Sequence, residues 1–259
     1  MKPSTTLILT ATITPPAGVP DLLRVDPSVR LRDYLEAFEF YLSVPTKTLP
    51  RIVFAENSAS DITPFRQMAD RLGRGKEVFV TSHDGLDHAP SLGRAYGEMK
   101  LLDRIVDTYE PVSTLPDDAL LWKGTGRYAL KNIARLIETA PKSYDLYCDL
   151  KDRPRLWFDM RFFSFSVAGY RRLLRGRYLE TLDDIDLGST RETIGICELM
   201  LRHWIEPRLD DPAIVPRFRV EPFIEGIRGF DNHSYSKGKN LTKYWLRTVS
   251  RAVAPRLWI

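Results

Sequence analysis

The sequence predicts an α/β fold in which helices cover both faces of a mixed, mainly parallel sheet. Strand-like and helix-like runs alternate through the first 140 residues, a pattern typical of parallel sheets. The chain of 259 residues is long enough for one large domain of this class. With 43% hydrophobic and 28% charged residues, its composition is that of an ordinary globular protein.

In the first half, short apolar or β-branched runs predict strands over 5–14, 51–57, 76–82 and 119–125. Apolar residues at helical spacing predict helices over 29–44, 61–73, 92–109 and 130–140. Asp61 is expected to cap the second helix, because Asp is favoured at that position. Since crossovers between parallel strands are right-handed, the loops after the four strands should gather along one edge, where open α/β sheets bind ligands.

The pattern changes after residue 140. Residues 144–150 and 155–166 alternate as β segments, 167–178 and 191–205 are predicted to be helical, and 217–231 is extended with Pro and Gly breaks. This half is expected to complete the sheet and to supply the other wall of a cleft. We therefore expect one domain over 1–236, followed by a basic tail or helix over 237–259.

Positive charge is concentrated near the C-terminus. The formal net charge is +4, and residues 237–259 contain no acidic residue. Their six cations are Lys237, Lys239, Lys243, Arg247, Arg251 and Arg256. Such a segment can contact phosphate-bearing surfaces, either lipid or nucleic acid. An alternative is a helix packed on the domain.

Two further observations bear on the compartment. Cys148 and Cys197 lie far apart in segments that look buried, which favours a reducing environment over a disulfide framework. No run of about 18 apolar residues is present, so no membrane-spanning helix is predicted. We expect a cytoplasmic protein that can associate peripherally with the inner face of the membrane.

The loop after the fourth predicted strand reads Lys123-Gly124-Thr125-Gly126-Arg127. Its glycines allow backbone amides to approach a ligand closely, and Thr125 offers a hydroxyl. Lys123 and Arg127 can pair with phosphate oxygens. The glycine spacing matches neither a P-loop nor a dinucleotide fingerprint.

The other loops at this edge are also polar. They contain Thr12, then Glu56 and Asn57, then His83 and His88. Such polarity is expected of a nucleotide or sugar site, and equally of any solvated loop. The histidine spacing fits no familiar zinc arrangement, so no metal site is predicted.

Acidic residues in the second half are candidates for catalysis. Asp159 and Arg161 interrupt an aromatic run and point to the same strand face, so we expect a partly buried pair, with a solvated salt bridge as the alternative. Glu221 and Glu225 precede a Gly-rich turn. Either could be a general base toward an acceptor hydroxyl, or an ordinary exposed acid.

In their order, the segments from residue 5 to about 235 resemble a family of bacterial glycosyltransferases that occur with surface-polysaccharide assembly systems. The most specific pieces are "FAENS", "AYGE" and "KGTGRY". The resemblance implies a GT-A-like nucleotide-sugar fold, in which the fourth-strand loop usually carries an Asp-x-Asp that holds a divalent metal. Here "KGTGR" stands in that place. No metal ligands are therefore expected, and Mg²⁺ or Mn²⁺ is not expected as a cofactor, because fixed cations can stabilise a departing phosphate instead.

The resemblance also implies roles for particular residues. The donor site would be formed by Thr12, Glu56, Asn57, Lys123, Thr125, Gly126, Arg127, Tyr128 and Arg161. Lys123 and Arg127 would neutralise the phosphate, while Tyr96 would contact the acceptor. Glu98 would lie near the sugar or pair with Arg127. The catalytic candidates are Asp159, Glu225 and Glu98, with Asp159 or Glu225 as the base if the reaction inverts the anomeric centre.

The implied function is sugar transfer from a nucleotide-sugar donor to a glycan or lipid-linked acceptor, in the assembly of lipopolysaccharide O-antigen or capsule. An anionic membrane surface is the further partner expected for residues 237–259. The alternative is a nucleic-acid-binding or nucleotide-processing protein that uses the basic tail. Because the sequence contains no helix-turn-helix, RNA-binding aromatic signature or zinc module, no nucleic-acid partner is expected.

Overall fold

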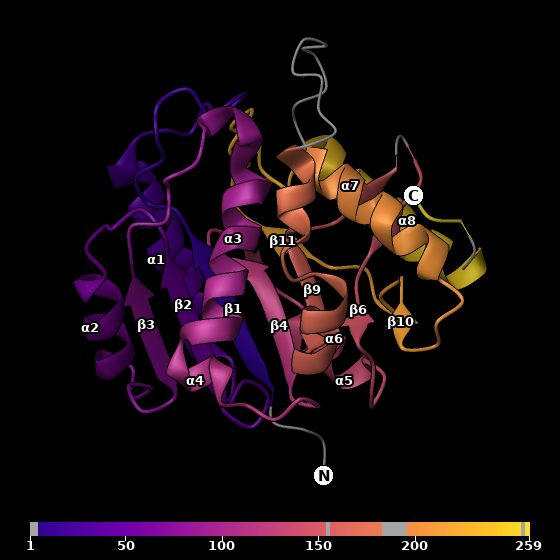
Figure 1. The fold of residues 1–259 in the computed structure, drawn as a ribbon, viewed down its shortest axis with the longest axis horizontal. Helices are drawn as coiled ribbons and strands as arrows, with labels where there is room; N and C mark the ends of the chain where they lie inside the picture. Colours follow the sequence, from indigo (N-terminus) through magenta and orange to yellow (C-terminus); the bar gives the residue numbers. More distant parts are fainter. Residues whose placement is uncertain (1–4, 154–155, 183–195, 255–256) are drawn as a thin grey trace.

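A seven-stranded sheet forms the centre of the protein, in the order β10-β6-β9-β4-β1-β2-β3 (Figure 1). The structure is a computed structural model, and it describes residues 5–153, 156–182, 196–254 and 257–259. The strands of this sheet are β1 (Thr6–Ala11), β2 (Arg51–Glu56), β3 (Val78–Ser82), β4 (Leu120–Thr125), β6 (Leu146–Tyr147), β9 (Phe162–Ser166) and β10 (Ile214–Val215).

Strands β1 to β4 are parallel to one another, whereas β9 is antiparallel to both of its neighbours, β4 and β6. The register pairs Ile8 of β1 with Val53 on one side and with Lys123 on the other. Strand β10 is parallel to β6. The mixed, mainly parallel sheet confirms the fold class predicted from the alternation of elements.

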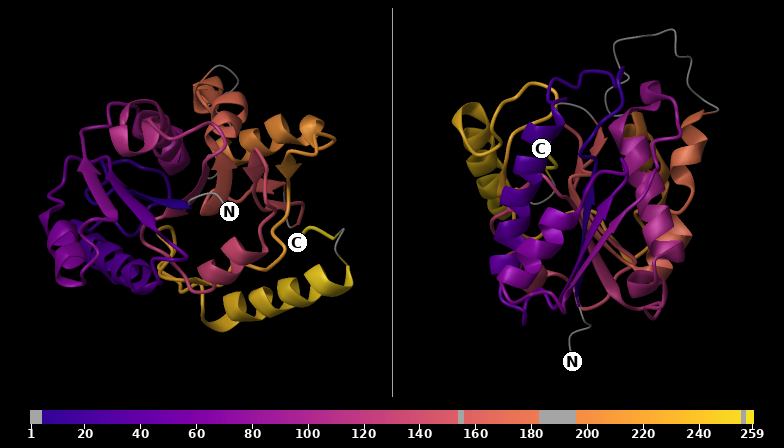
Figure 2. Two further views of the ribbon diagram at one scale, coloured as in Figure 1. Left: turned by 90° about the horizontal axis from the view of Figure 1, so that it is seen from below. Right: turned by 90° about the vertical axis from the view of Figure 1, so that its left-hand side faces the viewer.

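Helices cover both faces of the sheet (Figure 2). One face carries α3 (Gly93–Thr108), α4 (Glu110–Ser113), α6 (Val167–Leu173) and α7 (Ile196–Ile205). The other face carries α1 (Pro27–Ser43), α2 (Thr63–Arg71), α5 (Ile133–Thr139) and α8 (Gly238–Val253). The 3-10 helices are η1 (Pro90–Leu92), η2 (Arg177–Leu182) and η3 (Glu206–Arg208).

Strand alternation divides the core in two. Because successive side chains of a strand point to opposite faces, Ile8 packs with the α3 side, whereas Leu7 and Leu9 pack with the α1 side. Leu121 joins the first cluster and Trp122 the second. The face to which each β4 side chain points is therefore fixed by its place in the strand.

Two small sheets accompany the large one. Strands β5 (Ala129–Leu130) and β11 (Ile224–Glu225) pair antiparallel, as do β7 (Leu150–Lys151) and β8 (Trp157–Phe158). The helix expected over 130–140 starts only at Ile133, because Ala129 and Leu130 pair with β11 instead. The extended stretch predicted over 217–231 thus contributes one short strand.

Other boundaries differ in detail. Ile62 rather than Asp61 is the N-cap of α2, although Asp61 accepts a 2.8 Å hydrogen bond from the Thr63 N–H. Residues 191–195 of the predicted helix 191–205 lie outside the described residues. The basic segment expected from residue 237 forms α8, which lies along the α1 side of the sheet (Figure 2).

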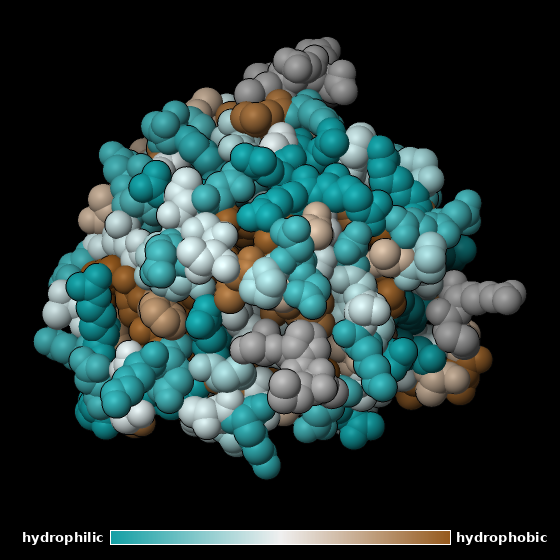
Figure 3. All heavy atoms as spheres, turned by 60° about the horizontal axis from the view of Figure 1, so that its bottom comes forward, coloured by the Kyte–Doolittle hydropathy of each residue, from teal (hydrophilic) through white to brown (hydrophobic). Residues whose placement is uncertain are grey.

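The surface in Figure 3 is largely hydrophilic, with hydrophobic side chains in separate small areas. Among the helices of the described residues, none has the length and apolar character needed to cross a membrane.

Candidate active site

A cavity of about 490 Å³ opens at the carboxyl ends of β1, β2 and β4. Thr12, Asn57 and Arg127, from the loops after these three strands, line it. Helices α3, α7 and α8 supply further wall residues. The gathering of these loops at one sheet edge agrees with the prediction from parallel strand order.

The cavity has a cationic lining. Among the described residues, nine lysines and arginines line it, against four carboxylates. The cations are Arg30, Arg94, Arg127, Lys151, Arg153, Arg161, Arg228, Lys243 and Arg247. The carboxylates are Glu98, Asp159, Glu198 and Glu221. A cleft with this balance of charge attracts anionic ligands such as phosphates.

Beneath the cavity lies a buried ion pair between Lys123 and Glu98. Lys123 is fully buried, because its position in β4 directs it to the same side as Leu121, toward α3. Its Nζ lies 2.7 Å from Glu98 Oε1 and 3.1 Å from Thr125 Oγ1, and also donates to the Met160 carbonyl. The hydroxyls of Thr125 and Thr10 donate to the same carboxylate.

This pair corrects two expectations from the sequence. Glu98 is the partner of Lys123, not of Arg127. Glu98 and Thr125 line the cavity, whereas Lys123 is not part of the lining and its ammonium is held below the wall. Burial lowers the pKa of Lys123, and the adjacent Glu98 carboxylate opposes that shift.

Arg127 reaches the cavity from the loop after β4. Its Nη1 lies 3.4 Å from Asp33 Oδ2 and 3.4 Å from the Ile227 carbonyl, and its Nη2 donates to Tyr128 Oη at 3.2 Å. Both Arg127 and Tyr128 line the cavity. Gly126 does not: its N–H donates to the Thr10 carbonyl at 2.8 Å, and an added Cβ would lie 3.0 Å from that oxygen.

The loops after β1 and β2 contain three residues that were predicted to form the donor site, and two of them line the cavity. Thr12 and Asn57 line it, and the Thr12 hydroxyl donates to Asn57 Oδ1 at 2.7 Å. Glu56 is buried outside the lining, where its carboxylate accepts hydrogen bonds from the backbone N–H groups of Ile13 and Ser60 at 3.0 and 3.1 Å. Glu56 therefore fixes the shape of the loops rather than facing a ligand.

Asp159 and Arg161 form the partly buried pair that was expected, but they do not share a strand face, because the β segment predicted over 155–166 breaks between β8 and β9 and both residues lie in that break. Arg161 Nε donates to Asp159 Oδ1 at 2.7 Å, and its Nη2 donates to the other oxygen. Burial alone would raise the pKa of Asp159, but Arg161 and Lys151 lower it well below its usual range. Both residues line the cavity. A carboxylate held in this way is a weak base.

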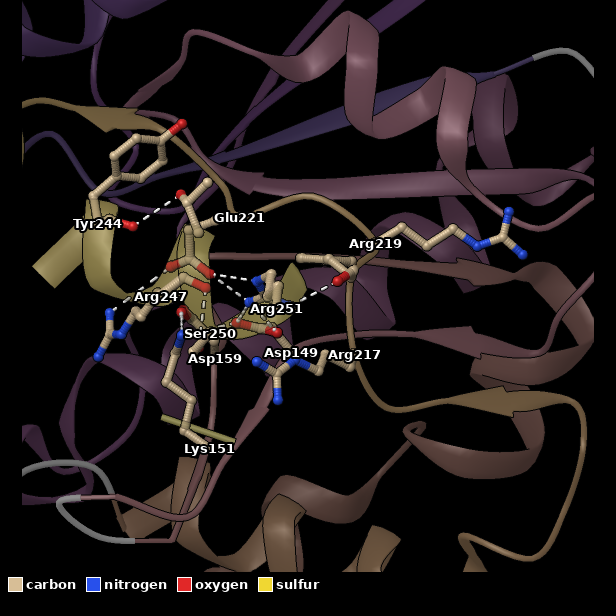
Figure 4. Close-up of polar contacts among 12 residues, drawn as sticks. Asp149, Lys151, Asp159, Arg217, Arg219, Glu221, Tyr244, Arg247, Ser250 and Arg251 are labelled. Carbon is tan, nitrogen blue, oxygen red and sulfur yellow. Dashed lines mark hydrogen bonds and ion pairs between the residues drawn. The ribbon is translucent and has the colours of Figure 1, made fainter. Parts of the chain in front are cut away.

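The Asp159 pair continues into a chain of alternating charges that reaches α8 (Figure 4). Lys151 Nζ lies 4.0 Å from Asp159 Oδ2 and 2.8 Å from Asp149 Oδ2. Arg251 of α8 then contacts Asp149 Oδ1 at 2.7 Å and Glu221 Oε2 at 2.6 Å. These contacts hold α8 against the sheet, so that Lys243 and Arg247 on its inner side become cavity wall.

Two predicted residues lie away from the cavity. Glu225 is exposed, with Oε2 3.8 Å from Lys131 Nζ, because alternation in β11 turns Ile224 inward and Glu225 outward. Tyr96 is buried in the α3 side of the core, with its ring 4.8 Å from that of Tyr178. Helix α3 presents Gly97 and Glu98 to the cavity instead.

Sequence reasoning missed several wall residues. Glu198 lies in α7, within an apolar pattern that gave no sign of a site. Arg30 of α1 also lines the cavity, and its Nε donates to the Thr12 carbonyl at 2.9 Å. The wall residue Lys151 and its buried partner Asp149 could have been noticed, because they interrupt a buried run in "YCDLKD".

In the described part of the chain, no group of three or more His, Cys, Asp or Glu side chains is arranged to hold a metal ion. His83 and His88 flank the edge of the site, and burial lowers the pKa of each.

The chain matches no family model and no curated protein. Similar solved structures include the glycosyltransferase GlyE of Streptococcus pneumoniae TIGR4, at 10% identity and a TM-score of 0.46. That match covers 82% of this chain and 44% of GlyE, so the chain spans less than half of its length.

Two more solved structures match over much of their length. The inositol-1-phosphate CTP transferase of T. maritima is 13% identical, with 98% of this chain and 99% of that one covered and a TM-score of 0.44. The galactosyltransferase LgtC, solved with donor and acceptor sugar analogues, is 11% identical over 79% of this chain and 65% of its own, with a TM-score of 0.42. At these identities and TM-scores the similarities assign no activity to this chain.

The buried pair leads to a prediction about stability. Lys123→Met should lower the free energy of unfolding by about 3 kcal/mol, because it leaves the Glu98 carboxylate without its buried partner. The double variant Lys123→Met/Glu98→Gln should lose less than the sum of the two single losses. Urea unfolding measures all three free energies.

The matched control is Lys131→Met, which removes an exposed lysine and should cost less than about 1 kcal/mol. A loss in Lys123→Met no larger than that of the control would show that the pair does not hold β4 to α3.

Proposed function

We propose that the protein is a glycosyltransferase that moves a sugar from a nucleotide-sugar donor to a glycan or lipid-linked acceptor, in the assembly of lipopolysaccharide O-antigen or capsule. The observation that carries this proposal is the cation-rich cavity at the carboxyl edge of β1, β2 and β4. The resemblance of "FAENS", "AYGE" and "KGTGRY" to surface-polysaccharide glycosyltransferases supports the reaction and its setting.

In this proposal Arg127 binds the donor diphosphate. Its contacts to Asp33 and Ile227 are both 3.4 Å, which is long for charge-assisted hydrogen bonds, so its N–H groups can still bind phosphate oxygens. The neighbouring Thr12 and Asn57 would contact the nucleoside, and Thr125 the sugar phosphate. Lys123 acts indirectly, by fixing Glu98 and Thr125 in the cavity floor.

We further propose that transfer needs no divalent metal. Charge develops on the nucleoside diphosphate as it leaves, and fixed cations in a cavity can stabilise that charge without reorganising. Arg127 stands at the end of β4, and Arg30 and Arg94 line the same cavity. The presence of these three arginines in one cavity supports the proposal that cationic side chains stabilise the leaving group.

The charge distribution around α8 disfavours the alternative of nucleic-acid binding. Arg251 is paired with Asp149 and Glu221, and Arg247 Nη1 lies 4.0 Å from Glu221 Oε1. Two cations of the C-terminal segment are therefore neutralised within the fold and do not contribute to an outward basic patch.

We propose that the outer face of α8 rests on an anionic membrane surface. Trp245, Leu246, Val249 and Val253 are 58%, 60%, 56% and 76% exposed, although they share one side of the helix. A helix packed on a domain usually turns its apolar side inward, whereas α8 turns its apolar side outward. The exposed Lys239 supplies positive charge beside the apolar side, as in helices that lie at membrane surfaces.

Donor binding is tested by a thermal-shift panel of UDP-, GDP-, dTDP- and ADP-sugars with EDTA present. One donor should raise Tm, because a ligand at a hundredfold excess over its Kd raises the free energy of unfolding by about 2.7 kcal/mol. The rise should be equal with EDTA and with Mg²⁺, because the proposed binding needs no metal. Arg127→Ala should weaken binding of that donor about tenfold or more, as expected for the loss of a charge-assisted hydrogen bond.

The control Arg135→Ala removes an exposed arginine of α5 and should leave binding unchanged. A panel in which no sugar nucleotide shifts Tm would contradict the proposed function. A shift seen only with Mg²⁺ would contradict its independence from metal.

Membrane docking is tested by sedimentation with phosphatidylglycerol vesicles. The double variant Trp245→Ser/Val249→Ser should lose most of its vesicle binding, because it removes apolar area from the docking face. Leu72→Ser, at an exposed apolar residue near the end of α2, should bind like the unmodified protein. Equal binding by both variants, or a dimer in solution that only the double variant disrupts, would rule out the membrane as the partner of this face.

A further inference from the structure

Glu198 lines the cavity and has no cationic partner among the residues that the structure describes. It occupies the first turn of α7, where its neighbour Cys197 packs into the core and Glu198 lines the cavity. Its carboxylate accepts a hydrogen bond from its own backbone N–H. The residue is thus held at the cavity wall by the first turn of a helix.

The other three carboxylates of the cavity are committed to cations. Glu98 Oε1 lies 2.7 Å from Lys123 Nζ. Asp159 is held by two nitrogens of Arg161, and Glu221 by Arg251. Within the described ranges, by contrast, no lysine or arginine nitrogen approaches the Glu198 carboxylate to within 4.0 Å.

The surroundings of Glu198 favour its protonated form. Burial raises its pKa to about 7, with a further increase from Glu98, while Arg94 and Lys123 oppose the shift. The other titratable groups on segments packed against α7 are Tyr96, Lys100, Asp103, Arg104 and Asp107 on α3, Arg177, Tyr178 and Glu180 on η2, and Glu206 and Arg208 on η3. Arg177 and Arg208 lie over the Trp204 ring, farther along α7.

We propose that Glu198 is the catalytic base that accepts the proton of the acceptor hydroxyl, in a transfer that inverts the anomeric centre. This inference rests on the proposed glycosyltransferase function. It replaces Asp159, which is bound by Arg161, and Glu225, which lies outside the cavity. The assignment places the base on an element that sequence reasoning did not include.

The acceptor oxygen forms a bond to the anomeric carbon of the donor sugar, and its proton passes to a carboxylate oxygen of Glu198. The bond between the anomeric carbon and the β-phosphate oxygen breaks, and its electron pair leaves with the nucleoside diphosphate. Arg127 faces that departing charge. A base whose pKa lies close to the working pH is efficient in such a transfer.

The test uses the sugar nucleotide selected by the thermal-shift panel, with water as the acceptor. The initial rate of hydrolysis should fall about tenfold for each pH unit below pH 7 in the unmodified protein, because only ionised Glu198 accepts the proton. Glu198→Gln should lose about 100-fold or more in rate and lose this acid limb. Its Kd for the donor should change less than about twofold.

The folding of Glu198→Gln is checked by measuring its free energy of unfolding over the same pH range. A carboxyl with a raised pKa in the folded state stabilises the protein below its unfolded pKa, and this contribution is lost as the pH rises to about 7. Glu198→Gln should therefore be at least as stable as the unmodified protein at pH 8. The conservative Glu198→Asp should retain the acid limb at a lower rate, and Glu110→Gln, at an exposed glutamate of α4, should match the unmodified protein.

A Glu198→Gln variant that binds donor and hydrolyses it at the unmodified rate, with the acid limb intact, would overturn the base assignment and leave the proposed function standing. Failure of every sugar nucleotide to bind the unmodified protein would overturn both.

Discussion

The site depends on one buried ion pair, between Lys123 in the central strand β4 and Glu98 on α3. A buried charge without a partner is costly, so each residue fixes the position of the other. Because the hydroxyls of Thr10 and Thr125 donate to the same carboxylate, the pair also sets the ends of β1 and β4. The cavity floor is thus built from charged and hydroxyl groups whose positions are determined by the sheet and by α3.

A second set of charges determines the opposite wall. Asp149 and Glu221 bind Arg251 on the inner side of α8, and Arg161, Asp159 and Lys151 join this group to the cavity. Since the polar side of α8 is used for these contacts, its apolar side faces outward. One arrangement therefore explains both the cationic lining and the exposed Trp245. We propose that this helix, which forms one wall of the cavity, also meets the membrane.

The sequence predicted the fold class because alternating elements leave few topologies open, and it predicted the edge where Thr12, Asn57 and Arg127 meet. It misplaced Lys123, although strand alternation from Leu121 could have shown that its side chain points into the α3 side of the core. Glu198 could not be identified, because its importance comes from packing between α7 and α3. Glu225 was a catalytic candidate from the sequence, but the pairing of β11 with β5 turns its side chain outward, away from the cavity.

The central claim is that fixed cations take the place of a metal at the end of β4. A crystal structure with the nucleoside diphosphate of the selected donor, grown in EDTA, tests it most directly. The account predicts the diphosphate bound to Arg127 at the carboxyl edge of β1 and β4, with the nucleoside against Thr12 and Asn57. A diphosphate bound elsewhere, or one that occupies the cavity only when Mg²⁺ or Mn²⁺ bridges it to carboxylates, would contradict the account.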